Sequence, residues 1–146
     1  MEKFKMKLTK ETNTLNFTSK KIYNFISNVY NFEKILGNDI KDFTIVNKEK
    51  FSAKIGSLPR INLKLELSDN EEKVTLVSCN AKMDFSFEFL VEKIDISKSK
   101  IKMHFLGNFS SMIEMMVKNP LEKFTQEIIS KLDNIEFNWC KLVLDF

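Results

Sequence analysis

The sequence contains few of the residues that break or crosslink a chain. Its 146 residues include 3 Gly, 2 Pro, 2 Cys and 1 His. So little Gly and Pro excludes collagen-like and low-complexity chains. Cys79 and Cys140 lie far apart, without a CxxC spacing or a nearby His, which excludes a disulfide framework and predicts reduced thiols.

Long apolar runs are also missing. No run approaches the ~18 residues that a membrane-spanning helix needs. The first residues carry scattered charges and no apolar stretch of the kind found in secretory signals. The sequence therefore predicts a cytoplasmic protein with no integral membrane segment.

Arginine is almost absent from the basic residues. All but one of the 23 basic residues are Lys, the exception is Arg60, and the 20 acidic residues leave a net charge of +3. Arg presents a rigid fork that suits phosphate and guanine, whereas Lys is a hydrated point charge. This composition favours a soluble surface, and no nucleic-acid partner is predicted.

Large apolar residues are abundant, with 14 Phe, 7 Met and 43% hydrophobic residues overall. A chain of this length can bury roughly 68–70% of its unfolded surface. A full core is therefore available without disulfides or metals. No linker-like stretch or repeat divides the chain, so residues 1–146 are predicted to form one domain, with 137–146 as an extension of unassigned structure.

The apolar pattern changes along the chain. Alternation over residues 3–13 predicts a strand, and helical spacing after Thr18 or Ser19 predicts two short helices that end at Leu36. From residue 40 to residue 108, alternation interrupted by turn residues predicts six more strands in a meander. The odd-numbered residues of the last two strands are predicted to face inward.

The chain from residue 111 onward is predicted to form a long helix. Ser111 with Glu114 three residues later has the pattern of a capping box. Pro120, preceded by Asn, repeats a helix-start signal, so the helix is predicted to be kinked or restarted there. Glu127 and Lys131 are spaced to form an exposed ion pair on this helix.

This order of elements predicts an α+β fold in which the helix covers a curved antiparallel sheet of seven strands. One helix cannot fill the curve completely, so we expect a cavity for a mostly apolar guest. From the residues alone, packing in a filled core accounts for the Met residues at the start of the helix somewhat better than a cavity does. The residues predicted to line the cavity are Phe43, Leu65, Phe85, Phe87, Phe89, Met103, Phe105, Met112, Met116, Phe124 and Ile128.

Three stretches resemble the helix-grip superfamily (SRPBCC), which includes START lipid-transfer domains, pollen-allergen-type proteins and polyketide cyclase/dehydrase proteins. Residues 19–28 and 31–36 are similar to its first two helices, and residues 112–124 are similar to its Met-rich final helix with a Lys/Asn-Pro-Leu step. The resemblance covers about residues 3–135 and is closest to small bacterial single-domain members. The tail beyond Phe137 departs from the usual ending of the family.

The resemblance implies a hydrophobic pocket between the sheet and the C-terminal helix. We therefore expect this protein to bind or transport a small hydrophobic or amphipathic molecule, lipid-like or polycyclic. Two alternatives stay open: a polyketide cyclase/dehydrase-like enzyme, and an interaction or co-chaperone-like module whose cavity is filled by Phe side chains. A protein partner is left open.

No catalytic motif supports an enzyme. His104, the single His, alternates with inward residues and is predicted to face solvent, where it cannot act as a base on a buried substrate. Glu88 and its acidic neighbours also take outward positions. Tyr23 and Tyr30 are predicted to keep their hydroxyls in water at the edge of an apolar face. We predict no catalytic residue, no metal and no cofactor.

Overall fold

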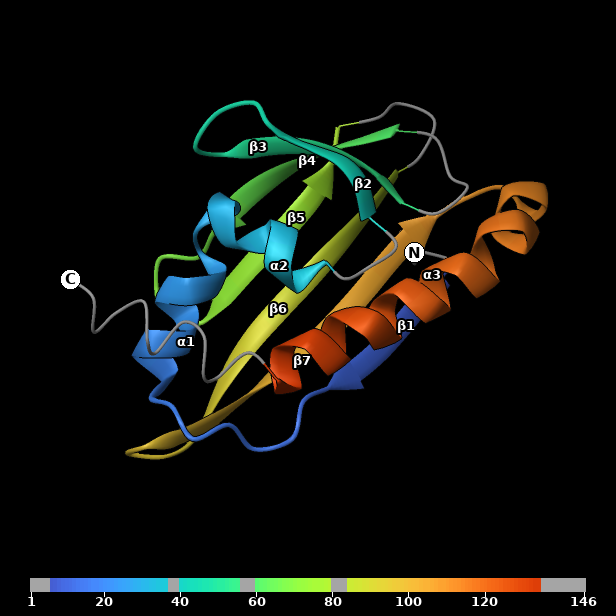
Figure 1. The fold of residues 1–146 in the computed structure, drawn as a ribbon. Coiled ribbons are helices and arrows are strands. Elements are labelled where there is room, and N and C mark those ends of the chain that lie inside the picture. The colour runs from blue at the N-terminus through green and yellow to red at the C-terminus, as the bar shows by residue number, and fades with distance from the viewer. Residues whose placement is uncertain (1–5, 37–39, 56–59, 80–83, 135–146) are drawn as a thin grey trace.

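The computed structural model describes residues 6–36, 40–55, 60–79 and 84–134. The described residues form an antiparallel sheet covered by helices (Figure 1). The strands are β1 (Met6–Glu11), β2 (Ile40–Ile45), β3 (Lys50–Ile55), β4 (Arg60–Leu67), β5 (Lys73–Ser78), β6 (Asp84–Asp95) and β7 (Lys98–Asn108). The helices are α1 (Ser19–Ile26), the 3₁₀ helix η1 (Val29–Asn31), α2 (Phe32–Ile35) and α3 (Ser111–Asp133).

The sheet is a meander with one additional edge strand. Its strand order is β1-β7-β6-β5-β4-β3-β2. β2 to β7 pair consecutively, and β1 pairs with β7 so that Leu8 lies opposite Phe105. The seven-stranded antiparallel sheet predicted from alternation is confirmed, as are the short helices after the first strand and the long C-terminal helix.

Helix α1 begins where the sequence predicts. The side chain of Thr18 accepts a hydrogen bond from the N–H of Lys21 at 3.1 Å and so caps the helix. Its buried side includes Ile22, Phe25 and Ile26. The 3₁₀ turn η1 follows, capped by Asn28, and leads directly into α2.

One detail predicted for α3 is wrong. The cap is Ser110, whose side chain accepts a hydrogen bond from the N–H of Ile113, so the helix begins at Ser111 and the capping box with Glu114 does not form. At Pro120, where the sequence predicts a kink or a restart, the helix does not restart but runs through the proline. Pro120 has no N–H to donate to the carbonyl of Met116, and in Figure 1 the first turns of α3 are inclined to the rest.

The core lies between the concave face of the sheet and α1, α2 and α3. The predicted inward residues of β6 and β7 are buried, with Phe87, Phe89, Met103 and Phe105 each at 0% exposure. α3 packs against β1 on one side and α2 on the other (Figure 1). Among the residues that the structure describes, no helix is both long and apolar enough to cross a membrane.

Candidate functional site

Aromatic side chains dominate the concave face beneath α3. A first group, the α3 cluster, joins the ends of β6 and β7 to the helix. Phe87 lies 5.0 Å from Phe105 and 5.7 Å from Phe124 between ring centroids. Phe85 lies 5.6 Å from Phe105 and 6.4 Å from Phe109. These edge and tilted contacts are the arrangements that aromatic rings prefer.

A second group, the α2 cluster, covers the other half of the face. Phe32 of α2 stacks on Phe51 of β3 at 5.8 Å and contacts Phe89 of β6 at 5.9 Å. Phe43 of β2 stacks on Phe51 at 5.0 Å. This cluster therefore runs from the middle of the sheet to its β2 edge.

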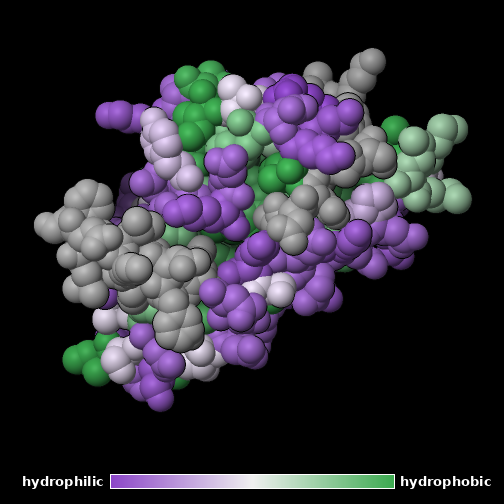
Figure 2. All heavy atoms as spheres, viewed as in Figure 1, coloured by the Kyte–Doolittle hydropathy of each residue, from purple (hydrophilic) through white to green (hydrophobic). Residues whose placement is uncertain are grey.

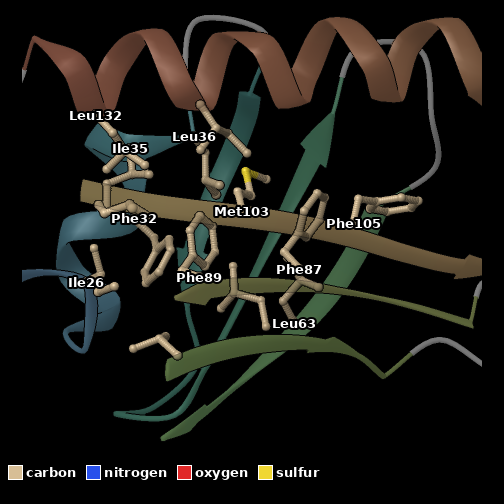
Figure 3. Close-up of a cluster of buried hydrophobic side chains, with 14 of the residues drawn as sticks. Ile26, Phe32, Ile35, Leu36, Leu63, Phe87, Phe89, Met103, Phe105 and Leu132 are labelled. Atoms are coloured by element: carbon tan, nitrogen blue, oxygen red, sulfur yellow. The ribbon is translucent and has the colours of Figure 1, made fainter. Parts of the chain in front are cut away.

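The two clusters meet at Phe87 and Phe89, which are successive inward residues of β6 (Figure 3). Figure 3 also shows Met103 and Leu36 pointing into the region between sheet and helix. Because these groups offer only carbon and sulfur atoms, this face suits an apolar guest rather than a polar one.

Burial decreases toward the β2 edge. The inward side chains of β6 and β7 are buried, whereas Ile40, Phe43 and Ile45 of β2 are only half-buried against the core. Figure 1 places α3 along β1 and β7, away from β2, and Figure 2 shows apolar atoms at the surface between α3 and the elements above it. The candidate site is therefore the apolar face between β2 and α3.

A β-bulge turns all three β2 side chains inward. The register of β2 against β3 shifts between Lys41 and Thr44, and Asp42 has a φ of 53°. The guanidinium of Arg60 donates a 3.1 Å hydrogen bond to the Asp42 carbonyl and lies 3.7 Å from its carboxylate. The extra residue at the bulge shifts the inward and outward alternation of side chains along β2 by one position. Ile40 therefore lies on the inner face together with Phe43 and Ile45.

Nine of the predicted lining residues lie on the concave face or on the buried side of α3. Phe43 is half-buried and Leu65 is 6% exposed. The others, each at most 1% exposed, are Phe85, Phe87, Phe89, Met103, Phe105, Phe124 and Ile128.

The inward orientation predicted for Met112 and Met116 is wrong. Their side chains are 73% and 67% exposed. The buried stripe of α3 begins only at Val117 and continues through Leu121, and Figure 1 shows the first turns of the helix extending past the end of the sheet. These Met residues have no sheet beneath them, so they cannot line the site.

Three further apolar residues lie on this face that the sequence does not predict for the site: Phe32, Leu36 and Phe51. The prediction of an exposed ion pair between Glu127 and Lys131 is wrong. Within the part of the chain that the structure describes, Oε2 of Glu127 is buried and has no hydrogen-bond partner.

The histidine and the two tyrosines have different surroundings. His104 lies on the outer face of β7, as predicted, with Nδ1 3.0 Å from Oγ1 of Thr9. Tyr23 is buried, contrary to the prediction that its hydroxyl stays in water, and it donates a hydrogen bond to the carbonyl of Ser68 at 3.3 Å. Tyr30 is 60% exposed.

Two surface pockets are lined by described residues, and polar side chains predominate in both. One, of about 390 Å³, lies between the start of α1 and the β4–β5 turn, beside Lys20, Asp69 and Glu72. The other, of about 350 Å³, lies beside Ser27, Lys48 and Lys64. Their charged linings do not suit an apolar molecule. No described group of three His, Cys, Asp or Glu side chains is placed to hold a metal ion.

No family model and no curated protein matches this sequence. Solved structures do match it. A START superfamily protein from Mycobacterium smegmatis superposes with a TM-score of 0.69 and 9% identity, over 87% of this chain and 94% of that one. A norcoclaurine synthase point mutant from Thalictrum flavum, in complex with a transition-state analogue, superposes with a TM-score of 0.67 and 13% identity, over 90% and 96%.

This chain has the helix-grip fold. The di-domain ARO/CYC protein BexL, from the BE-7585A biosynthetic pathway, matches as well, with a TM-score of 0.66, 11% identity and coverage of 90% of this chain and 46% of that one. These identities are too low to transfer an activity. In helix-grip proteins a long helix lies over a curved sheet. The apolar face described above lies between the sheet and this helix.

Proposed function

We propose that this protein binds a small hydrophobic or amphipathic molecule between β2 and α3, as a carrier or receptor of that molecule. The observation that carries the proposal is the half-buried apolar edge formed by Ile40, Phe43 and Ile45. A β-bulge turns these apolar side chains toward the core, but the covering helix leaves them only half-buried. An apolar partner that covers them removes this surface from water, which is favourable.

The walls of the site support a ligand with an extended apolar body. Phe43 and Phe51 present stacked rings on the sheet side. Leu121 and Phe124 form part of the buried face of α3. We propose that the molecule inserts between these two walls. There it exchanges water for carbon contacts on both of its faces, which is the main source of affinity in sites of this kind.

The first experiment tests whether the purified protein carries a ligand. Protein purified without detergent is extracted with organic solvent, and the extract is compared by mass spectrometry with an extract of an unrelated protein prepared in the same way. We expect an apolar species at a substantial molar ratio to protein, present only in the first extract.

The second experiment measures binding directly. Delipidated protein is titrated with a neutral polarity-sensitive dye, and fatty acids, fatty alcohols and quinones are then tested as competitors. We expect saturable dye binding and competitive displacement. Absence of both a co-purifying species and saturable binding would refute the proposed function.

A further inference from the structure

Glu127 is an unusual residue on α3. Oε2 of its carboxylate is buried and, among the described residues, accepts no hydrogen bond. Lys131, one turn further along the helix, forms no ion pair with it in the described part of the chain, although the spacing would permit one. A buried carboxylate oxygen without a donor is unfavourable unless something else supplies that donor.

The geometry of α3 places Glu127 on the side of the helix that faces the candidate site. Successive helical residues are about 100° apart, so Glu127 and Ile129 lie on opposite sides of the fully buried Ile128. The Ile129 side is the β1 side, because Asp133, one turn later, accepts a 2.8 Å hydrogen bond from the N–H of Asn13 just after β1. Glu127 is therefore on the opposite side of the helix, where α2 packs (Figure 1).

Apolar residues of α3 and α2 lie on this side of the helix. Phe124, one turn earlier, belongs to the α3 cluster and contacts Phe87. On the α2 side, Leu36 and Ile35 lie beneath α3 near Leu132 (Figure 3). The carboxylate thus lies at the margin of a mainly apolar face. Lys131, one turn later, is on the same side of α3, but Glu127 is the charged residue there with a buried oxygen that has no donor, so it is the group that can select for a charge.

We infer that Glu127 selects ligands that combine an apolar body with a protonated amine. This inference rests on the proposed function and specifies its ligand class: the amine donates its N–H to the unpartnered carboxylate oxygen while the apolar body lies along the Phe rings. A fatty acid would instead place a second carboxylate beside Glu127, where like charges repel. The net charge of +3 favours anions at long range, so a preference for cations has to arise locally.

The test compares three probes that share a twelve-carbon alkyl chain and differ in their head group. They are dodecylamine, dodecanol and dodecanoate, each used below its micellar concentration at pH 7. Each probe displaces a neutral dye from the wild-type protein and from Glu127→Gln. The control is Glu122→Gln, because Glu122 lies two turns before Ile129 on the β1 side of the same helix. Circular dichroism checks that each variant is folded, and Glu127→Leu serves as a second variant if the first does not fold.

We expect the wild-type protein to bind dodecylamine at least tenfold more tightly than dodecanoate. Glu127→Gln should lose at least fivefold in amine affinity and keep its dodecanol affinity within twofold, and Glu122→Gln should match the wild type. Two results would refute the role of Glu127 and leave the proposed function standing. In the first, dodecanol binds and dodecanoate binds with the same affinity as dodecylamine. In the second, Glu127→Gln keeps the preference for the amine. If neither the dye nor any of the three probes binds, the role of Glu127 and the proposed function are both refuted.

Discussion

The ring of Phe124 on α3 meets the ring of Phe87 on β6 edge-on, with centroids 5.7 Å apart and ring planes inclined at 70°. Both side chains are almost completely buried, at 1% and 0% exposure. This contact connects the middle of the covering helix to the middle of the sheet. It therefore fixes how closely α3 approaches the concave face.

Replacing Phe124 should destabilise the whole domain. Phe124→Ala removes the contact with Phe87 and leaves a cavity, and we expect the free energy of unfolding to fall by about 3–5 kcal/mol. Urea denaturation followed by circular dichroism measures this loss. Met116→Ala on the same helix removes a side chain that is 67% exposed, and we expect it to change stability by less than about 0.5 kcal/mol. Equal losses in the two variants would contradict the assigned orientation of α3.

Ser110 and Ser111 are neighbouring residues of the same type with different roles. Ser110 accepts a hydrogen bond from the N–H of Ile113, whereas Ser111 is the first residue of the helix. We expect Ser110→Ala to cost about 1 kcal/mol of unfolding free energy because an amide at the helix start loses its acceptor. Ser111→Ala should be close to neutral. The reverse order in thermal or urea unfolding would place the cap at Ser111 instead.

The strands could be predicted from the sequence because alternation has a period of two. Along β6, Phe85, Phe87 and Phe89 take successive odd positions, and one buried face fixes the orientation of them all. The bulge at Asp42 could not be predicted in this way. It depends on a positive φ and on the position of Arg60, which comes from a different strand. Ile40 was therefore not predicted to join the site.

The helix was harder to interpret from its apolar residues alone. Met112 and Met116 have the same composition and spacing as residues of a buried stripe, and their exposure depends on where the sheet ends beneath α3. Sequence reasoning paired Glu127 with Lys131 because residues one turn apart on an isolated helix can meet. In the fold, Glu127 has a buried oxygen. Contacts of this kind depend on elements distant in sequence, so local patterns do not encode them.

Gly107 leaves room for aromatic rings on β7. A Cβ at this position would lie 2.6 Å from Cε2 of Phe109 and 3.0 Å from Cε2 of Phe105. Gly107→Ala should therefore push both rings out of place and cost about 1–3 kcal/mol of unfolding free energy. The comparison variant is Asn108→Ala, at the exposed next residue, which we expect to be nearly neutral. A Gly107→Ala protein as stable as the wild type would show that the rings adjust without loss.

Asp95, the last residue of β6, should titrate at unusually low pH. Its pKa is lowered from the usual 3.8, mainly because its carboxylate accepts a hydrogen bond from the backbone N–H of Ser97. The folded pKa is below the unfolded one, so the stabilisation is present above the unfolded pKa and is lost as pH falls through the folded pKa. NMR titration of the carboxyl carbon measures this pKa directly.

The Asp95 titration separates the two hydrogen bonds that Ser97 donates to the carboxylate. Ser97→Ala removes the hydroxyl, which lies 3.3 Å from Oδ1, and keeps the backbone N–H, so most of the pKa depression should persist. Ser97→Pro removes the N–H, and the pKa of Asp95 should then rise toward its usual value. A full return in Ser97→Ala would assign the effect to the hydroxyl instead.

Phe43 should contribute to ligand affinity more than to stability. Its ring stacks on Phe51 at 5.0 Å but stays half-buried, so it offers a face to a ligand. We expect Phe43→Ser to weaken dye binding at least tenfold, because an apolar contact surface becomes polar, and to cost only about 1–2 kcal/mol of unfolding free energy. Val46→Ser, which changes an apolar residue that is 59% exposed just after β2, should leave the dye affinity unchanged. Equal effects of the two substitutions on dye affinity would mean that the dye binds to the general surface. Weaker binding in Val46→Ser alone would contradict a site on the face between β2 and α3.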